Sequence, residues 1–381
     1  MTTVYLIRHA EAEGNLYRRV HGWYNSLITE NGFRQIAALE ERFRDIPVDA
    51  VYSSDLFRTM TTARAVYVPK GLELHTDPGL REMNLGDWED LSFGEVRHRF
   101  PEEMERFNTS DPTWQAPNGE DFFQMGARIE GAVRRIAARH PGQTVALFSH
   151  GMVIRQLIAR VKRVPPEQWR GVPHGDNTAV TRLAFNGEQF SLELELDNSH
   201  LPESISTLAR QAWWRRDGKK AADVNLWFRP VDWPGERELY LQRRRELCPG
   251  GDGAAFLREA EQALEHDPWG LTAAMAGEHT VGLLLADREK DREDRAGHVG
   301  FLTVFPEYRG RNLGIQLIGQ AVSQYREEGR DRLRLPCTQE ETSRGYFQKY
   351  GFAETAGPDG GAVWEKYVGF DWPVAAPLSP V

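Results

Sequence analysis

The stretch "VYLIRHAEAEGN", residues 4–15, begins with a short apolar run typical of a buried β-strand and then stops at Arg8 and His9. Two later stretches have the same form, "AVYSSDLFR" (50–58) and "TVALFSHG" (144–151). A longer amphipathic segment follows each run, and this alternation indicates an α/β fold with parallel strands. Parallel strands end at one edge of a sheet, so we expect the polar residues after the runs to face one crevice.

The polar residues near these strand ends are suited to phosphoryl transfer. The guanidiniums of Arg8 and Arg58 match the oxygens of a phosphoryl group, and their fixed charge stabilises the transition state. A neutral imidazole, such as His9 or His150, can attack phosphorus when its other ring nitrogen is held by a partner such as a backbone carbonyl. A leaving alkoxide also needs a proton, and Glu82 is the nearby candidate carboxylic acid.

Residues 1 to about 200 resemble the histidine phosphatase superfamily, which has the phosphoglycerate mutase-like fold. The resemblance rests on four motifs in order, "LIRHAEAEGN", "SSDLFRTMTTA", "LREMNLGDWED" and "SHGMVIRQLI". It implies a three-layer α/β/α domain in which His9 is the nucleophile and Glu82 the proton donor, without a metal or other cofactor. It also implies a phosphate pocket formed by Arg8, Asn15, Arg58 and His150.

The first motif departs from the family at Ala10, where glycine is usual. Alanine is the smallest possible intrusion, so we expect slight strain or a small shift of the loop and retained activity. Arg18, Arg19 and His21 follow this motif. They either bind a second anionic group of the substrate or belong to a solvated loop.

Hydrolysis and mutase-type phosphotransfer are both compatible with this half of the chain. Mutases of the family carry a longer insertion before the second histidine motif, whereas residues 83–149 are compact and contain "APNGEDF" (116–122), similar to the "PGGES" segment of the family's phosphatases. Hydrolysis is therefore favoured. The ester stays open among a phosphosugar, a phosphoglycerate, a nucleotide-like ester and a phosphohistidine on another protein. A domain that only binds phosphorylated partners is disfavoured, because nucleophile, acid and both arginines are present.

The pattern changes after a strand-like "FSLELEL" (190–196), where "RQAWWRRDGKKAAD" (210–223) is charged and fits a linker. Beyond it, residues 224–368 resemble the GNAT acetyltransferases, an α+β fold, in "LWFRPVDWPGERELYLQRRRE", "VGFLTVFPEYRGRNLG" and "SRGYFQKYGFAET". The predicted division is a histidine phosphatase domain at 1–205, a linker at 206–223, a GNAT domain at 224–368 and a Pro-rich tail at 369–381.

The GNAT resemblance implies an acetyl-CoA site on a strand and on the loop that follows it. Backbone N–H groups of such a loop, at a helix N-terminus, can cradle a pyrophosphate. The cofactor is expected along Leu302, Thr303 and Val304, with its pyrophosphate on Arg309, Gly310, Arg311, Asn312, Leu313 and Gly314. The family expects glycine at Asn312, but asparagine tolerates a left-handed conformation better than most residues.

Catalysis in the second half is less readily assigned. The family's proton donor to the departing thiolate is commonly a tyrosine at the position that aligns with Phe347. Tyr346 and Tyr350 flank it, but adjacent residues on a helix point about 100° apart, so neither is a simple replacement. We favour an N-acetyltransferase that acts on a small-molecule or peptide amine. The alternative is a CoA-binding regulatory or structural module.

Composition excludes several other classes of protein. The 381 residues are 40% hydrophobic and 27% charged, which is typical of a soluble globular chain long enough for two domains. The net charge of −9 disfavours a nucleic-acid partner. Cys248 and Cys337 have no disulfide-framework or metal-site spacing, and no run suggests a signal peptide or a membrane span. We therefore expect a cytoplasmic protein.

Overall fold

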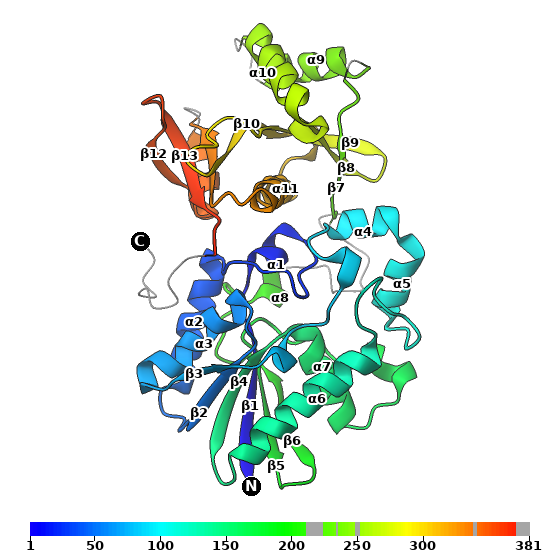
Figure 1. Cartoon of the computed structure of the whole chain (residues 1–381), viewed down its shortest axis with the longest axis vertical. Helices are drawn as coiled ribbons and strands as arrows, with labels where there is room; N and C mark the ends of the chain where they lie inside the picture. Colours follow the sequence, from blue (N-terminus) through cyan, green and yellow to red (C-terminus); the bar gives the residue numbers. More distant parts are fainter. Residues whose placement is uncertain (211–223, 234, 248–251, 338–340, 371–381) are drawn as a thin grey trace.

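Two α/β units, each built on its own sheet, make up the chain (Figure 1). The computed structural model describes residues 1–210, 224–233, 235–247, 252–337 and 341–370. The first unit ends at Arg210, and the second contains the remaining described residues.

The sheet of the first unit has six strands in the order β3-β2-β4-β1-β5-β6. The apolar runs predicted as strands form β1, β2 and β4, which lie next to one another in parallel. Parallel pairing does not extend through the whole sheet, because β5 and β6 join it antiparallel. The strands are β1 (Thr2–Arg8), β2 (Ala50–Ser53), β3 (Leu74–Thr76), β4 (Thr144–Ser149), β5 (Val180–Phe185) and β6 (Phe190–Asp197).

Helices cover both faces of this sheet and give the predicted α/β/α layers (Figure 1). Alternation along β1 explains the two cores: Val4 and Leu6 pack with the helices of one face, whereas Tyr5 and Ile7 pack with those of the other. The first face carries α6 (Phe122–Arg139) and α7 (Gly151–Val161), and the second carries α2 (Glu30–Phe43) and α3 (Phe57–Lys70).

Helix α2 begins directly after Thr29. The Thr29 side chain accepts a hydrogen bond from the N–H of Gly32 and so caps the helix. The shorter elements of the first unit are α1 (Glu13–Tyr17), η1 (Pro78–Leu80), η2 (Gly86–Trp88), α4 (Phe93–Arg99), α5 (Pro101–Thr109), η3 (Pro166–Gly171) and α8 (Thr207–Arg210).

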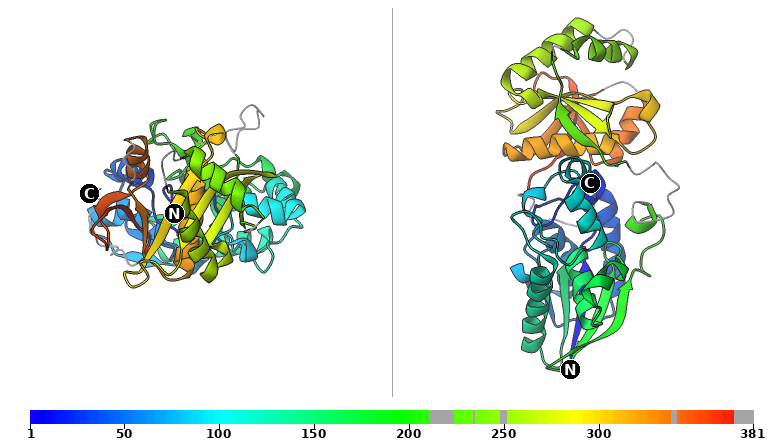
Figure 2. Two further views of the ribbon diagram at one scale, coloured as in Figure 1. Left: turned by 90° about the horizontal axis from the view of Figure 1, so that it is seen from above. Right: turned by 90° about the vertical axis from the view of Figure 1, so that its right-hand side faces the viewer.

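The second sheet has seven strands in the order β12-β13-β11-β10-β9-β8-β7. Its strands are β7 (Trp227–Pro230), β8 (Leu271–Ala276), β9 (His279–Asp287), β10 (Ala296–Val304), β11 (Arg332–Pro336), β12 (Ala353–Ala356) and β13 (Ala362–Tyr367). Its helices are α9 (Arg237–Leu247), α10 (Gly253–His266), η4 (Pro268–Gly270), η5 (Pro306–Tyr308), α11 (Gly314–Glu327) and α12 (Glu341–Lys349). Helices α9 and α10 lie on one side of the sheet and α11 on the other (Figures 1 and 2).

The second unit stands on the edge of the first sheet where β1, β2 and β4 end, with α11 against α1 (Figures 1 and 2). Tyr17 of α1 is part of the hydrophobic core of the second unit. The approach requires glycine at Gly319, because a Cβ there would lie 2.5 Å from the Cβ of Tyr17. The two units therefore share a packed interface.

The predicted linker begins with structured residues. Helix α8 forms its start, whereas 211–223 lie outside the described residues, as do 371–381 of the predicted tail.

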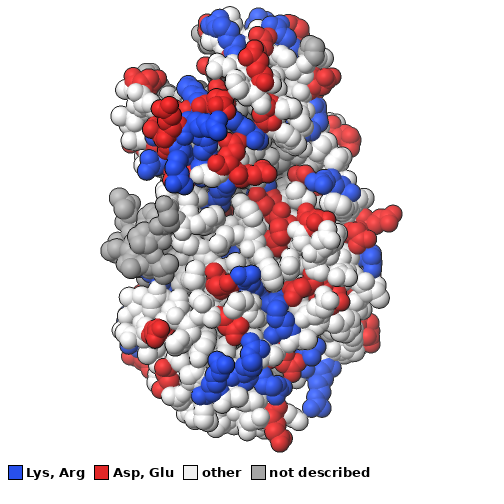
Figure 3. All heavy atoms as spheres, viewed as in Figure 1, with Lys and Arg blue, Asp and Glu red and all other residues white. Residues whose placement is uncertain are grey.

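Among the residues that the structure describes, no helix combines the length and the apolar character needed to cross a membrane. On the face shown in Figure 3, Lys and Arg side chains are interspersed with Asp and Glu side chains.

Candidate active sites

The register of the first sheet brings together the two histidines that were predicted to share a site. Arg8 at the end of β1 pairs with Ser149 at the end of β4. The next residues, His9 and His150, lie side by side with ring centroids 5.3 Å apart. Both are buried, with 3% and 0% of their surfaces exposed.

His9 is held as a neutral imidazole. Its Nδ1 lies 2.7 Å from the carbonyl oxygen of Ala10. A carbonyl only accepts hydrogen bonds, so Nδ1 carries the proton and Nε2 keeps its lone pair. Burial lowers the pKa of His9 well below its ordinary value, and the charges of Arg58 and Arg8 lower it further. This is the state in which an imidazole is nucleophilic.

Arg58 lies against His150 in the same buried pocket. Its Nε donates to Nδ1 of His150 at 3.2 Å, and its other N–H groups donate to backbone carbonyls within residues 21–24. The Nε2 of His150 lies 2.8 Å from the hydroxyl of Ser54. Burial lowers the pKa of Arg58 to about 10, so the side chain remains a cation at neutral pH.

Arg8 reaches the same region from β1. It donates to the carbonyl of Gly175 at 2.6 Å, whereas its buried Nε has no hydrogen-bond partner within the described part of the chain. That Nε faces the start of α7, because a Cβ on Gly151 would lie 3.2 Å from it. Asn15 lies on α1, where its side-chain oxygen accepts from the N–H of Ala12.

Glu82 lies at the start of α7, the helix that directly follows His150. Its two carboxylate oxygens accept hydrogen bonds from the backbone N–H groups of Met83, Met152 and Val153. The last two belong to the first turn of α7, which follows His150. The structure therefore places Glu82, which is 8% exposed, beside the histidines although they are far apart in the sequence.

A partly buried ion pair that the sequence analysis missed holds the loop of Glu82. Arg128 of α6 donates to backbone carbonyls within residues 79–82 and pairs with Glu120 at 2.7 Å. Glu120 also accepts from the N–H of Asn84. The one sequence signal was the segment "APNGEDF", which contains Glu120 but was used only to separate phosphatases from mutases.

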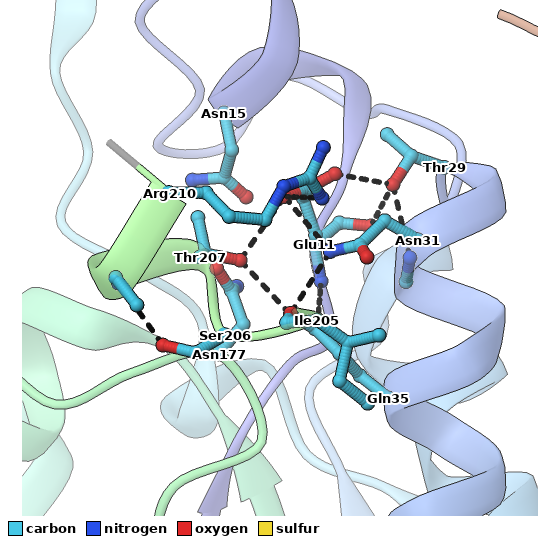
Figure 4. Close-up of polar contacts among 12 residues, drawn as sticks. Glu11, Asn15, Thr29, Asn31, Gln35, Asn177, Ile205, Ser206, Thr207 and Arg210 are labelled. Atoms are coloured by element: carbon cyan, nitrogen blue, oxygen red, sulfur yellow. Dashed lines mark hydrogen bonds and ion pairs between the residues drawn. The ribbon is translucent and has the colours of Figure 1, made fainter. Parts of the chain in front are cut away.

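A polar network around Glu11 fixes the segment that follows His9 (Figure 4). The buried Glu11 carboxylate accepts from Thr29 and Asn31 near the start of α2 and from Thr207 of α8. Asn177 donates to the carbonyl of His9 at 2.9 Å. Segments distant in sequence thus hold the carbonyl of the candidate nucleophile and the side chain of Glu11 two residues beyond it.

Ala10 occupies a position that alanine adopts without strain. It is fully buried, its N–H donates to Thr62, and its φ lies outside the positive range. The slight strain expected for an alanine in place of glycine is therefore absent.

The basic residues after the first motif have separate partners. Arg18 donates to Asn225, and Arg19 pairs with Asp90 and donates to Gln320 and Ser323 of α11. These arginines join the two units and are not in a solvated loop. The ring of His21, in contrast, meets that of His9 edge-on at 5.8 Å.

The predicted acetyl-CoA loop connects β10 with α11. Strand β10 pairs with β11 only over Ala296–His298 and continues alone on that side to Val304. Asn312 has φ of 54°, so it adopts the left-handed conformation that permits it to replace glycine. No side chain caps the N-terminus of α11, and the preceding residues 309–312 are exposed. Within the described residues, the N–H of Arg309 already donates to the carbonyl of Pro306, so the N–H groups from Gly310 onward are the ones that fit a pyrophosphate.

Phe347, which aligns with the family's proton-donor position, and its neighbour Tyr346 have different surroundings. Phe347 packs against Phe352 and Trp364 in the core. The hydroxyl of Tyr346 is buried and has no hydrogen-bond partner within the described residues, and a Cβ on Gly314 would lie 2.6 Å from it. Tyr346, not Phe347, therefore directs a polar atom to the start of α11.

Comparison with protein-family models identifies both units. Residues 4–198 match the histidine phosphatase superfamily (branch 1), and residues 255–369 match the acetyltransferase (GNAT) domain. The chain belongs to the histidine phosphatase superfamily and carries a GNAT domain, which implies the use of acetyl-CoA. Both resemblances stated from the sequence are confirmed.

Similar proteins cover the first unit. The chain is 32% identical over 206 residues to phosphoglycerate mutase-like protein 4 of Arabidopsis thaliana, covering 53% of this chain and 87% of that protein. It is 32% identical over 165 residues to a probable phosphoglycerate mutase GpmB of Yersinia pestis, covering 43% and 77%. The solved structure of Bacillus stearothermophilus YhfR matches with a TM-score of 0.51 and 34% identity, covering 52% of this chain and 99% of that one.

Proposed function

We propose that the first domain hydrolyses phosphate monoesters through a phosphohistidine at His9. The contact that supports this most directly is the hydrogen bond from Nδ1 of His9 to the Ala10 carbonyl, because it leaves Nε2 free to attack. Arg8, Arg58, His150 and Asn15 are the proposed phosphate-binding residues. The guanidinium cations of Arg8 and Arg58 would neutralise the charge that develops on the phosphoryl oxygens.

The proposed reaction has two displacements. In the first, Nε2 of His9 forms a bond to phosphorus while the ester P–O bond breaks, and Glu82 gives a proton to the leaving oxygen. In the second, Glu82 takes a proton from water, the water oxygen attacks phosphorus and the P–N bond breaks. Inorganic phosphate is released and both residues regain their starting states.

Rapid quenching of the full-length protein with p-nitrophenyl phosphate tests this proposal. We expect an acid-labile phosphoryl group that mass spectrometry assigns to His9, formed at the rate of the p-nitrophenol burst. The variant His9→Ala should form none. A phosphoryl group on another residue, or wild-type turnover by His9→Ala, would contradict the assignment. Phosphate transfer to a second substrate hydroxyl in place of water would show mutase chemistry.

We propose that the second domain transfers an acetyl group to an amine. Acetyl-CoA supplies the acetyl group as a thioester when it is bound. Backbone N–H groups between Arg309 and Gly314 are proposed to bind its pyrophosphate, and Leu302, Thr303 and Val304 to line the adjacent strand. The hydroxyl of Tyr346 is the proposed donor of a proton to the departing sulfur, since burial raises its pKa and keeps it protonated.

Calorimetry with acetyl-CoA and a thiol-release assay with a panel of small-molecule and peptide amines test this proposal. We expect binding and amine-dependent thiol release in the full-length protein. Binding without turnover across the panel would favour the alternative, a CoA-binding regulatory module. The absence of binding would leave only a structural role.

A further inference from the structure

The carboxylate of Glu89 binds the backbone of a loop at the phosphate pocket. Its two oxygens accept four hydrogen bonds of 2.7 to 3.0 Å, from the N–H groups of Gly22, Trp23, Tyr24 and Leu85. The approach requires glycine at Gly22, because a Cβ there would lie 2.4 Å from Oε1 of Glu89. Charge-assisted bonds to three successive residues fix the course of the loop at 22–24.

Carbonyl groups of the same loop bind Arg58. Its two Nη atoms donate to the carbonyls of His21, Gly22 and Tyr24 at 3.0, 2.7 and 2.9 Å. With the bond from Nε to His150, these contacts use four of the five N–H groups of the guanidinium. The loop therefore sets the plane of Arg58 and leaves one N–H group of Nη1 for a phosphoryl oxygen.

Two peptide units of the loop bind both charged side chains at once. In the unit that joins His21 to Gly22, the carbonyl accepts from Arg58 and the N–H donates to Glu89, both at 3.0 Å. In the unit that joins Gly22 to Trp23, both distances are 2.7 Å. Each peptide dipole thus directs its negative end to the cation and its positive end to the carboxylate. Hydrogen bonds linked in this way polarise and strengthen one another.

Glu89 also supports the charge of Arg58. Burial lowers the pKa of Arg58 to about 10, and the carboxylates of Glu82 and Glu89 oppose this effect. Glu82 is the proposed acid and changes its charge during the reaction. Glu89 uses both of its oxygens to bind backbone N–H groups, so its charge remains beside Arg58 throughout.

We propose that Glu89 is a positioning residue of the phosphatase site, which sets the orientation of Arg58 through the peptide units of residues 21–23. The inference rests on the proposed phosphatase function and gives a role to a second carboxylate of "LREMNLGDWED", besides that of Glu82. Glu89 needs no contact with the substrate, because it holds the loop and the loop holds the guanidinium.

Glu89→Gln tests this role in the full-length protein. The amide replaces one acceptor oxygen by a donor that faces N–H groups, so Arg58 loses its fixed position. Phosphorylation of His9, measured by rapid quenching, should slow about tenfold or more. The factor should be the same for methyl phosphate and p-nitrophenyl phosphate, because the acid Glu82 is intact. Asp87→Asn, which alters an exposed carboxylate two residues away, is the matched control and should stay within about twofold.

Two results with these esters would overturn the inference. One is an unchanged rate in Glu89→Gln. The other is a loss confined to methyl phosphate, which would show that Glu89 acts on the protonation of the leaving group. If the wild-type protein forms no phosphohistidine at all, the proposed phosphatase function fails as well.

A double-variant cycle with Arg58→Ala separates positioning from a general loss of structure. If Glu89 acts through Arg58, adding Glu89→Gln to Arg58→Ala should slow phosphorylation of His9 by less than about twofold. A loss of about tenfold in that background too would assign the effect to the structure as a whole and overturn the inference. Glu89→Asp, which keeps the charge but withdraws it by one methylene, takes the place of Glu89→Gln in the cycle if that variant does not fold.

Discussion

The two candidate sites of this chain depend on their sequences in different ways. In the phosphatase domain, the proposed nucleophile and its neighbours come from strand ends and are buried, and backbone groups hold them. In the acetyltransferase domain, Asn312 adopts a left-handed φ where the family expects glycine, but the usual tyrosine position holds a phenylalanine packed against Trp364. The proposed phosphatase site therefore depends on strand register, whereas the proposed acetyltransferase chemistry depends on one side chain, Tyr346, next to the family's usual position.

The largest effect is expected for Glu82→Gln in the phosphatase domain. This variant cannot protonate the leaving oxygen, so phosphorylation of His9 by methyl phosphate should slow about 10³-fold. Phosphorylation of His9 by p-nitrophenyl phosphate should slow much less, because p-nitrophenolate leaves without a proton. Rapid-quench rates of this first step with both esters measure the difference and leave out the later attack of water, in which Glu82 acts as a base. Equal losses would show that Glu82 does not act as the acid.

Arg326→Met is expected to have the next largest effect, which is a loss of stability at the interface between the two domains. It leaves the buried carboxylate of Glu13 without its cation, so the free energy of unfolding in urea should fall by about 3 kcal/mol. Adding Glu13→Gln should restore part of the loss, because the unpaired charge is then gone. The exposed pair of Arg99 and Glu95 is the control, and Arg99→Met should cost less than about 0.5 kcal/mol. No recovery in the double variant would assign the loss to packing alone.

Tyr346→Phe tests whether Tyr346 donates the proton to the departing sulfur in the acetyltransferase domain. Loss of the hydroxyl should slow amine-dependent thiol release about 10²-fold while the Kd of acetyl-CoA stays within about twofold. The reciprocal variant Phe347→Tyr should not restore activity to Tyr346→Phe, since that ring packs against Trp364. Rescue by Phe347→Tyr would show that the ordinary family position is still accessible.

His9 is expected to remain neutral where an ordinary histidine becomes charged. Its pKa is lowered by burial, Arg58 and Arg8, so its ring carbon signal in ¹³C-labelled protein should not change as the pH is lowered through about 6.5, where an ordinary histidine titrates. The signal is assigned by its loss in His9→Ala. A midpoint near 6.5 would contradict this environment.

The sequence predicts the parts of each site that are local in the chain. The strands at 4–7, 50–54 and 144–148 are readable because a short apolar run is a property of neighbouring residues. The Arg326–Glu13 pair was not predictable, because its members are 313 positions apart and either could pair with many surface charges. For the same reason Arg19 was read as a possible substrate ligand, whereas the structure uses it to join the domains.

The smallest effect is expected for Asn312→Gly, which tests whether the backbone conformation of the loop, and not a side chain, determines the binding of acetyl-CoA. Asn312 already adopts φ of 54°, so glycine can take its place without rearranging the loop, and the Kd of acetyl-CoA should change less than about twofold. Asn312→Val is the informative partner, because a β-branched residue in the left-handed region costs about 1–2 kcal/mol and should weaken binding about tenfold. Calorimetry with the full-length protein measures both values. If valine bound acetyl-CoA as well as glycine did, the left-handed turn would not shape the pyrophosphate site, and the acetyltransferase site would depend on side chains throughout.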